Sequence, residues 1–216
     1  MIRNKNFIVK ICGVKDYETA QNIFKLKPTM IGLVFVPGSI RCIEIETARK
    51  ITTEAHNLGI LVVGVFQNQV FEYVSRILKS ILLDYVQMHG VEDISFCKKL
   101  NSPVIKTIIP ANHSIEEIKT LMNKYSGIVD YFLIDRNVQG TGKKVDFKIV
   151  EKLTRDYPII LAGGLNKDNI EYAVISAGKG LSGVDTSSGV ENSPGEKDMK
   201  SVESFILNAR RAYESV

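Results

Sequence analysis

The sequence lacks the features that mark several large classes of protein. Its three cysteines, Cys12, Cys42 and Cys97, form no CxxC or Cys/His spacing, so neither a disulfide framework nor a zinc site is indicated. No apolar run approaches the roughly 18 uncharged residues of a membrane helix, and the first residues, MIRNKNFIVK, contain no apolar core of a secretory signal. We therefore expect a soluble, cytoplasmic protein with no membrane partner.

An excess of charge of one sign is also missing. The 28 Lys and Arg residues against 24 Asp and Glu residues leave a net charge of +4, which is too small and too dispersed for a nucleic-acid groove. This balance does suit a small anionic substrate. Hydrophobic residues make up 44% of the chain and charged residues 24%, which places it among globular proteins.

The chain contains, in contrast, a repeated alternation of short apolar runs and amphipathic segments. Each run is rich in β-branched residues and ends at a polar or Gly-containing turn, which predicts a buried strand. Each following segment carries apolar residues at three- and four-residue steps, which predicts a helix. The expected strands are 7–12, 30–36, 60–66, 82–88, 104–109, 129–135, 158–163 and 180–185, and the expected helices include short ones within 91–100 and 146–153.

The number of these units indicates a closed barrel. Eight strand-helix units in 216 residues average 27 residues each, which leaves no length for a second domain. Apolar strands alternating with helices form a parallel sheet covered by helices, and eight units match a (β/α)8 barrel, or TIM barrel. We predict this α/β fold as a single domain over residues 1–216. An open doubly wound sheet is the alternative, but it usually carries GxGxxG after its first strand, where this chain has CGVKDYE.

Cys12 lies where such a barrel keeps its functional side chains, at the end of a strand. It ends the first expected strand, and Lys10, two residues earlier, points to the same barrel-facing side. A neighbouring ammonium raises the thiolate fraction of a cysteine, so Cys12 is a candidate reactive group. The alternative is a small buried hydrophobe, which is the commonest fate of a free cysteine.

Three other strand ends carry ionisable or polar groups. Asp135 ends the sixth expected strand and Asp185 the eighth, and each either takes part in chemistry, caps a loop or pairs with a lysine. Gln87 and His89 share one face at the end of the fourth strand. His89 is either a catalytic group or a hydrogen-bonded structural histidine.

Two loops, after the seventh and eighth expected strands, have the composition of a phosphate site. AGGLNKDN (162–169) and DTSSGVE (185–191) offer glycines that let backbone amides approach a ligand, serine hydroxyls, and the amino ends of the following helices. This pair of loops is a frequent phosphate seat in (β/α)8 enzymes. A third Gly-rich stretch, QGTGKKVDF (139–147), lacks the P-loop spacing, so nucleotide binding is a poor interpretation of it.

Several motifs, taken in order, carry a family resemblance. VKICGV, GLVFVPGSIR, VQMHG, LAGGLNKDN and VDTSSGVENSPGEKD resemble the motifs of phosphoribosylanthranilate isomerases, enzymes of tryptophan biosynthesis, and the resemblance runs from about Phe7 to Leu207. It implies an Amadori rearrangement of N-(5-phosphoribosyl)anthranilate to 1-(2-carboxyphenylamino)-1-deoxyribulose 5-phosphate, without metal or other cofactor. We expect this small phosphorylated molecule as the ligand, no nucleic-acid partner, and a monomer or a homodimer.

The resemblance assigns roles residue by residue. It implies that Cys12 is the general base, Asp135 the general acid, and Arg41 the group that binds the anthranilate carboxylate. An ordinary aspartic acid is only about 0.1% protonated at pH 7, so we expect an apolar strand and an anionic substrate to raise the pKa of Asp135. We expect Lys10 or another cation to lower the pKa of Cys12. The further substrate-binding candidates, mostly for the phosphate, are Gly163, Gly164, Asp185, Ser187, Ser188 and Gly189.

The sequence departs from the family pattern after the second strand. PGSIRCI places Cys42 where the family usually has an aromatic residue, and VDF and VFQN stand in place of FDW and VFVN. Because Cys42 is expected at the rim beside the strand of Cys12, we predict a Cys12–Cys42 disulfide on oxidation if the two Cα atoms lie within about 7 Å.

Other phosphate-binding barrels are the rival interpretations. A pentose-phosphate epimerase usually needs metal-binding His and Asp residues at several strand ends, where only His89 is available. An indole-glycerol-phosphate synthase relies on lysines and a glutamate, for which Lys10 and Lys106 give partial material. A non-catalytic phosphate-binding barrel would need neither Cys12 nor Asp135.

Overall fold

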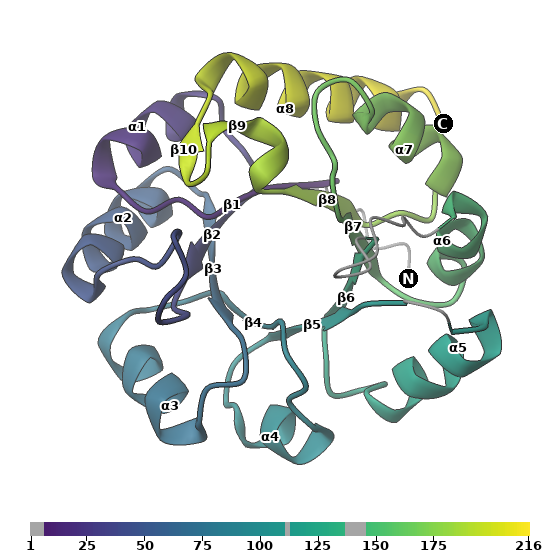
Figure 1. Cartoon of the computed structure of the whole chain (residues 1–216), viewed down its shortest axis with the longest axis horizontal. Coiled ribbons are helices and arrows are strands. Elements are labelled where there is room, and N and C mark those ends of the chain that lie inside the picture. The colour runs from purple at the N-terminus through teal and green to yellow at the C-terminus, as the bar shows by residue number, and fades with distance from the viewer. Residues whose placement is uncertain (1–6, 111–112, 137–145) are drawn as a thin grey trace.

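The chain forms a ring of eight parallel strands surrounded by helices (Figure 1). The structure, a computed structural model, describes residues 7–110, 113–136 and 146–216. The strands follow one another in chain order, and β8 closes the barrel by pairing with β1. The predicted (β/α)8 fold is confirmed, and the open-sheet alternative is wrong. The strands are β1 (Ile8–Cys12), β2 (Met30–Val34), β3 (Leu61–Phe66), β4 (Tyr85–Met88), β5 (Val104–Ile108), β6 (Tyr131–Asp135), β7 (Ile159–Ala162) and β8 (Gly183–Thr186).

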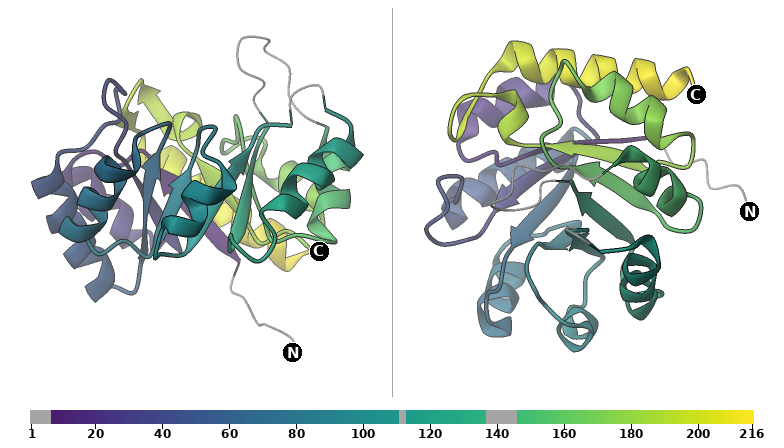
Figure 2. Two further views of the ribbon diagram at one scale, coloured as in Figure 1. Left: turned by 90° about the horizontal axis from the view of Figure 1, so that it is seen from below. Right: turned by 45° about the vertical axis from the view of Figure 1, so that its right-hand side comes forward.

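A helix follows each strand and packs on the outside of the barrel (Figure 2). Several begin where an acidic or hydroxyl side chain caps the free backbone amides, such as Asp16, Asp93 and Ser114, and Ser114 forms a capping box with Glu117. None of the helices in the described ranges is long and apolar enough to cross a membrane. The helices are α1 (Tyr17–Lys25), α2 (Ile45–Asn57), α3 (Phe71–Ser80), α4 (Ile94–Lys99), α5 (Ile115–Lys124), α6 (Phe147–Thr154), α7 (Ile170–Ala177) and α8 (Met199–Glu214).

The connection between β8 and α8 has structure of its own, which the sequence analysis does not predict. A short 3-10 helix, η1 (Ser188–Val190), leads into an antiparallel hairpin of β9 (Glu191–Ser193) and β10 (Glu196–Lys197). Gly195 turns this hairpin at a φ of 84°, a conformation that glycine adopts without strain. In Figure 1 the hairpin lies on the inner side of α1 and α8, close to the mouth of the barrel.

Alternation along the strands separates two layers of core. Apolar side chains between strands and helices form the larger core, and a second cluster fills the inside of the barrel. Along β1, Ile8 and Cys12 belong to the inner cluster while Val9 and Ile11 belong to the outer core. Lys10, between them in the same parity as Ile8 and Cys12, is fully buried. The predicted barrel-facing side of β1 therefore places a lysine and a cysteine inside the barrel.

Candidate active site

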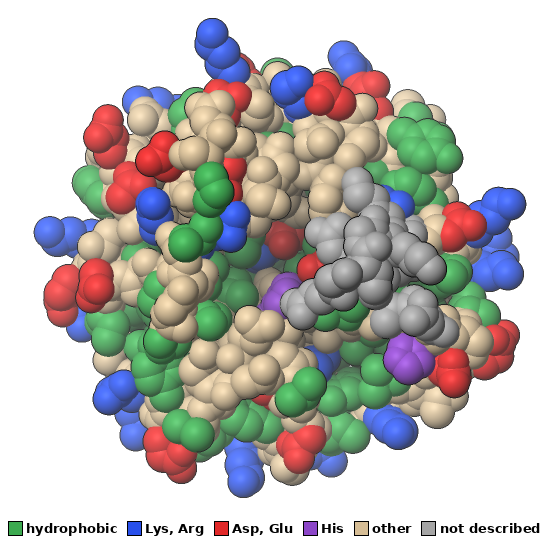
Figure 3. Space-filling view, in the orientation of Figure 1, with side chains coloured by type: hydrophobic (Ala, Val, Ile, Leu, Met, Phe, Trp, Pro, Cys, Tyr) green, Lys and Arg blue, Asp and Glu red, His purple; other side chains and the backbone are tan. Residues whose placement is uncertain are grey.

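A cavity of about 240 Å³ opens where the barrel strands end. Figure 3 shows the molecule hollowed near the centre of this face, with acidic, basic and histidine side chains gathered in and around the hollow. Nine residues predicted as site residues line the cavity together, and Gln87 and His89 line it as well. The nine are Cys12, Arg41, Asp135, Gly163, Gly164, Asp185, Ser187, Ser188 and Gly189.

Lys10 pairs with Asp185 beneath the cavity. Its ammonium Nζ lies 2.9 Å from Asp185 Oδ1, and both side chains are buried. Strand register brings them together, since Lys10 of β1 is the direct neighbour of Asp185 of β8. Of the alternatives for Asp185, pairing with a lysine is therefore observed, and a role toward substrate stays a prediction.

Cys12 lies at the top of this pair and is only 7% exposed. Lys10 and Lys197 lower the pKa of the thiol, as expected of cations, but burial raises it by more and Asp185 adds to this, so the net pKa of Cys12 is raised.

Gly32 of β2 makes the room for this arrangement. It pairs with Cys12, and a Cβ atom at Gly32 would lie 2.7 Å from Cys12 Sγ and 3.1 Å from Lys10 Nζ. Any larger side chain would displace the thiol or the ammonium. A strand residue outside the predicted site therefore determines where the thiol lies.

Asp135 lies close to His89 in the lining of the cavity. His89 Nε2 lies 3.8 Å from Asp135 Oδ2, while His89 Nδ1 lies 3.0 Å from the Gln87 amide nitrogen and 3.1 Å from the Thr107 hydroxyl. Because an amide nitrogen only donates, this arrangement makes Nδ1 an acceptor and puts the ring proton on Nε2, toward Asp135. Burial lowers the pKa of His89 although Asp135 opposes it, so the ring is neutral at pH 7.

Arg41 reaches the cavity with half of its guanidinium already engaged. Nε donates to Glu191 Oε1 at 2.8 Å and Nη2 donates to Oε2 at 2.6 Å, a bidentate pair. Lys197 Nζ lies 2.7 Å from the same Oε1. A substrate carboxylate therefore cannot form the expected two hydrogen bonds with Nε and Nη2 of Arg41, because Glu191 already accepts from both.

The two predicted phosphate loops lie side by side. Gly163 and Gly164 follow β7 with φ values of 92° and 66°, and the Thr186 hydroxyl donates to the Leu165 carbonyl at 2.7 Å, which ties the loops together. A Cβ atom at Gly189 would lie 1.9 Å from that carbonyl oxygen, so the second loop needs glycine there. Close packing of backbone against backbone leaves the amides of both loops at the mouth of the barrel, the setting of an anion site.

Comparison with known proteins agrees with this geometry. The family model for N-(5'-phosphoribosyl)anthranilate isomerase matches residues 9–208. This chain belongs to that family. It is 35% identical to the isomerase of Zygosaccharomyces bailii, with 92% of this chain and 96% of the relative covered, and 34% identical to that of Oceanobacillus iheyensis, with 94% and 97% covered.

Solved structures of phosphoribosylanthranilate isomerases have the same fold. The Thermotoga maritima enzyme aligns with a TM-score of 0.84 at 31% identity, covering 95% of this chain and 100% of that one. A phosphoribosylanthranilate isomerase in complex with reduced 1-(o-carboxyphenylamino)-1-deoxyribulose 5-phosphate aligns at 0.82, with the same identity and coverage. Membership of this family sets aside the epimerase and synthase interpretations.

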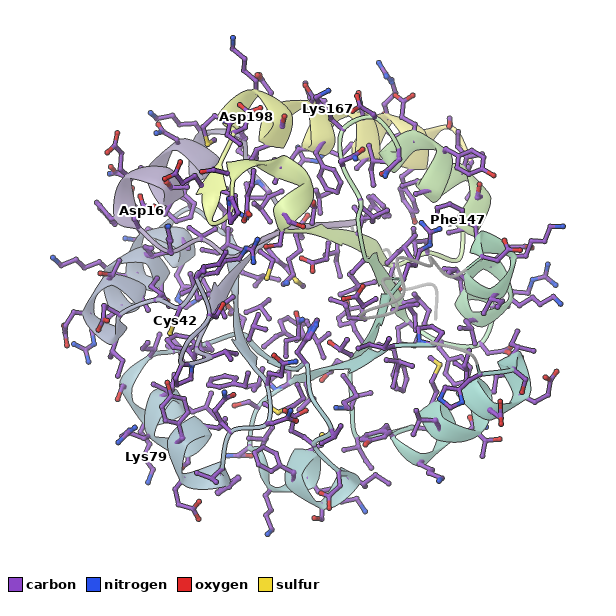
Figure 4. The ribbon with its side chains drawn as sticks, viewed as in Figure 1. Asp16, Cys42, Lys79, Phe147, Lys167 and Asp198 are labelled. Atoms are coloured by element: carbon purple, nitrogen blue, oxygen red, sulfur yellow. The ribbon has the colours of Figure 1, made fainter. Side chains whose placement is uncertain are left out.

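Cys42, the departure from the phosphoribosylanthranilate isomerase pattern, lies away from Cys12. It is exposed, and Figure 4 places it outside the ring of strands. Its thiol lies close to Glu44 and to Tyr73 of α3, whereas Cys12 is buried inside the barrel. This orientation opposes the predicted disulfide. The Gly-rich stretch, at its residues 139–145, lies outside the described residues.

Glu191 and Lys197 are two charged residues beside this isomerase site that the sequence analysis misses, and it also misses Ser39, Gln67 and Thr186 in the lining of the cavity. Glu191 and Lys197 both fall inside the quoted motif VDTSSGVENSPGEKD, and its Pro-Gly pair is a turn signal that folds the two residues onto each other. Had this turn been interpreted as a hairpin, the sequence would have indicated that Glu191 and Lys197 lie close together. In the described ranges no group of three or more His, Cys, Asp and Glu residues is arranged to hold a metal ion.

Proposed function

We propose that this protein catalyses the Amadori rearrangement of N-(5-phosphoribosyl)anthranilate, with Asp135 as general acid and Cys12 as general base. The observation that supports it is one cavity that both groups line, from β6 and β1, together with two phosphate-type loops and Arg41. An acid and a base on separate strands can act on different atoms of one bound sugar.

Two proton transfers by the protein and one tautomerisation account for the reaction. Asp135 protonates the ring oxygen of the ribosylamine, the bond from that oxygen to C1 breaks, and an open-chain imine protonated on nitrogen forms. The Cys12 thiolate then removes the proton from C2, and the C2–H electrons form the enamine, which becomes the amino ketone by moving a proton from the C2 hydroxyl to C1. Exchange with solvent returns one proton from the Cys12 thiol to the Asp135 carboxylate. Substrate and product are isomers, so no co-reactant is needed.

The charges of the site suit the two ends of this substrate. The phosphate is bound by the loops that contain Gly163, Gly164, Ser187, Ser188 and Gly189, and the aromatic carboxylate lies toward Arg41. At the floor of the cavity, the carboxylate of Asp185 holds Lys10 and accepts hydrogen bonds from the hydroxyls of the open-chain sugar. We keep the predictions of a cytoplasmic protein, a monomer or a homodimer, and no nucleic-acid partner.

The test is steady-state kinetics on purified variants. Cys12→Ser and Asp135→Asn should each lower the turnover number by about 100-fold or more with little change in KM, the usual size of a general acid or base contribution. Cys42→Ser is the matched cysteine control and should behave as wild type, since Cys42 is exposed outside the ring of strands. Near-normal turnover in either site variant would contradict that assignment, and in both it would favour a non-catalytic barrel.

A further inference from the structure

The carboxylate of Glu191 joins two cations at the rim of the cavity. It accepts from Arg41 Nε and Nη2, from Lys197 Nζ at 2.7 Å, and from the backbone amide of Gly195 at 3.0 Å. Four donors on one carboxylate use most of its lone-pair directions. Glu191 is therefore fully committed within the protein and has no free side for a substrate hydroxyl.

This cluster is buried, and its charges do not cancel. The side chains of Glu191 and Lys197 are 3% and 1% exposed, and that of Arg41 is 23% exposed. Two cations and one anion leave a net charge of +1. Because Arg41 is the exposed member and lines the cavity, this net charge is presented there. An anion with one negative charge is the ligand that balances it.

The arginine is also held along its stem. A Cβ atom at Gly13 would lie 2.6 Å from Arg41 Cδ, so the chain after β1 needs glycine for the arginine to pass over it. At the far end, Glu191 fixes the guanidinium plane through two parallel bonds. Among the described residues no hydrogen bond from Arg41 Nη1 is present, so its two N–H groups, beside the second N–H of Nη2, are left for a ligand.

Lys197 connects this cluster to the second phosphate loop. Its Nζ donates to the Ser187 carbonyl at 3.0 Å as well as to Glu191. The hairpin β9–β10 supplies both Glu191 and Lys197, so one turn of chain links the arginine to this loop. The position of the arginine relative to the second phosphate loop is thereby fixed.

We propose that Glu191 is a positioning residue, which holds Arg41 so that Nη1 and the net positive charge of the cluster select a substrate carboxylate. The inference deepens the proposed function and rests on it for the identity of that carboxylate. It predicts that losing the charge of Glu191 weakens recognition of the carboxylate and leaves the proton transfers nearly intact.

Binding of unreactive analogues tests this directly. Glu191→Gln should weaken calorimetric binding of the reduced product analogue by about 10- to 100-fold, the value of a hydrogen bond to a charged group. The same analogue without its ring carboxylate should bind both proteins within about twofold. Glu196→Gln, in the same hairpin but with an exposed side chain bonded to Ser193, is the matched control and should bind as wild type.

Kinetics and a double variant separate positioning from a structural role. Glu191→Gln should raise KM with turnover within about threefold, and Glu191→Asp, which keeps the charge, should recover part of the loss. In an Arg41→Ala background, Glu191→Gln should add little, because the group through which it acts is gone. If Glu191→Gln fails to fold, the binding of the two analogues is compared in Glu191→Asp and in Arg41→Ala instead.

The outcomes distinguish the inference from the function on which it rests. Equal weakening of both analogues, or no weakening of either, would overturn the role of Glu191. An unchanged Arg41→Ala variant would overturn it too, since Glu191 is proposed to act through that arginine. A wild-type protein that binds the carboxylated analogue but converts no N-(5-phosphoribosyl)anthranilate would contradict the reaction, while the binding comparison would still decide the role of Glu191.

Discussion

The cavity lies between two ion-pair networks that are built differently. At its floor, Lys10 and Asp185 project from neighbouring strands into the barrel and are buried, with Asp185 lining the cavity. At the rim, Arg41, Glu191 and Lys197 come from loops and a hairpin and leave the arginine partly exposed. The lower pair is neutral and part of the barrel core, and the rim cluster carries a net positive charge. We therefore expect the first to serve mainly stability and the tuning of Cys12, and the second mainly recognition.

Removing Lys10 should have the largest effect. Lys10→Met leaves the Asp185 carboxylate buried without its cation, and breaking such a pair costs about 3–5 kcal/mol of unfolding free energy. Urea unfolding measures it. Lys10→Met with Asp185→Leu should recover much of this stability because no charge is then stranded. Lys197→Met should cost less, since Glu191 keeps Arg41 as a partner. Equal losses for the two lysine variants would break the distinction between the networks.

The pH dependence of turnover should follow the ionisation of Cys12, which lies next to the Lys10–Asp185 pair. Burial raises the pKa of Cys12 above its usual value, so the thiolate fraction grows throughout pH 7 to 9. If the thiolate is the base, kcat/KM rises about tenfold per pH unit there. His89 does not cause this rise, because burial lowers its pKa and it is already neutral. A flat profile from pH 7 to 9 would contradict the assignment of Cys12 as base.

Acid should reveal the rim cluster. Burial alone would raise the pKa of Glu191, but hydrogen bonds from Arg41 and Lys197 outweigh it and lower the pKa to about 2 from 4.5. A depressed carboxylate pKa stabilises the fold above pH 4.5, and this contribution is lost as pH falls toward 2. The stability difference between wild type and Glu191→Gln should shrink by about 1–3 kcal/mol over that range.

The sequence predicts the barrel and the strand-borne part of the site well, for physical reasons. Alternation fixes which side of β1 faces inward, so Cys12 and Lys10 could be placed from residue parity alone. The partner of Lys10 and the net direction of the Cys12 pKa depend on register and burial, which one sequence does not specify. The rim was harder to predict, because Glu191 reaches Arg41 across 150 residues through a hairpin with only a local turn signal.

Packing of the phosphate loops should show a smaller and more specific effect. Gly189→Ala brings a methyl group into the Leu165 carbonyl, so the loops must separate. We expect competitive inhibition by inorganic phosphate to weaken about tenfold, which is about 1.4 kcal/mol. Gly59→Ala is the control: its Cβ would meet nothing, although its φ of 72° adds strain. It should lose some stability and keep its phosphate inhibition. Equal phosphate inhibition in the two variants would contradict the assignment of these loops to phosphate binding.

Oxidation of Cys42 should have the smallest effect on turnover, and it tests whether an exposed residue next to the rim contributes to catalysis. Its thiol is exposed beside Glu44 and Tyr73, while Cys12 is buried; the pKa of both thiols is raised, so exposure is what distinguishes them. Peroxide should oxidise Cys42 first, and turnover should change by less than about twofold, because the exposed thiol is the accessible one. Peptide mass spectrometry with parallel activity assays measures both. A Cys12–Cys42 crosslink that appears together with loss of turnover would mean that the rim opens far enough to bring the two thiols together.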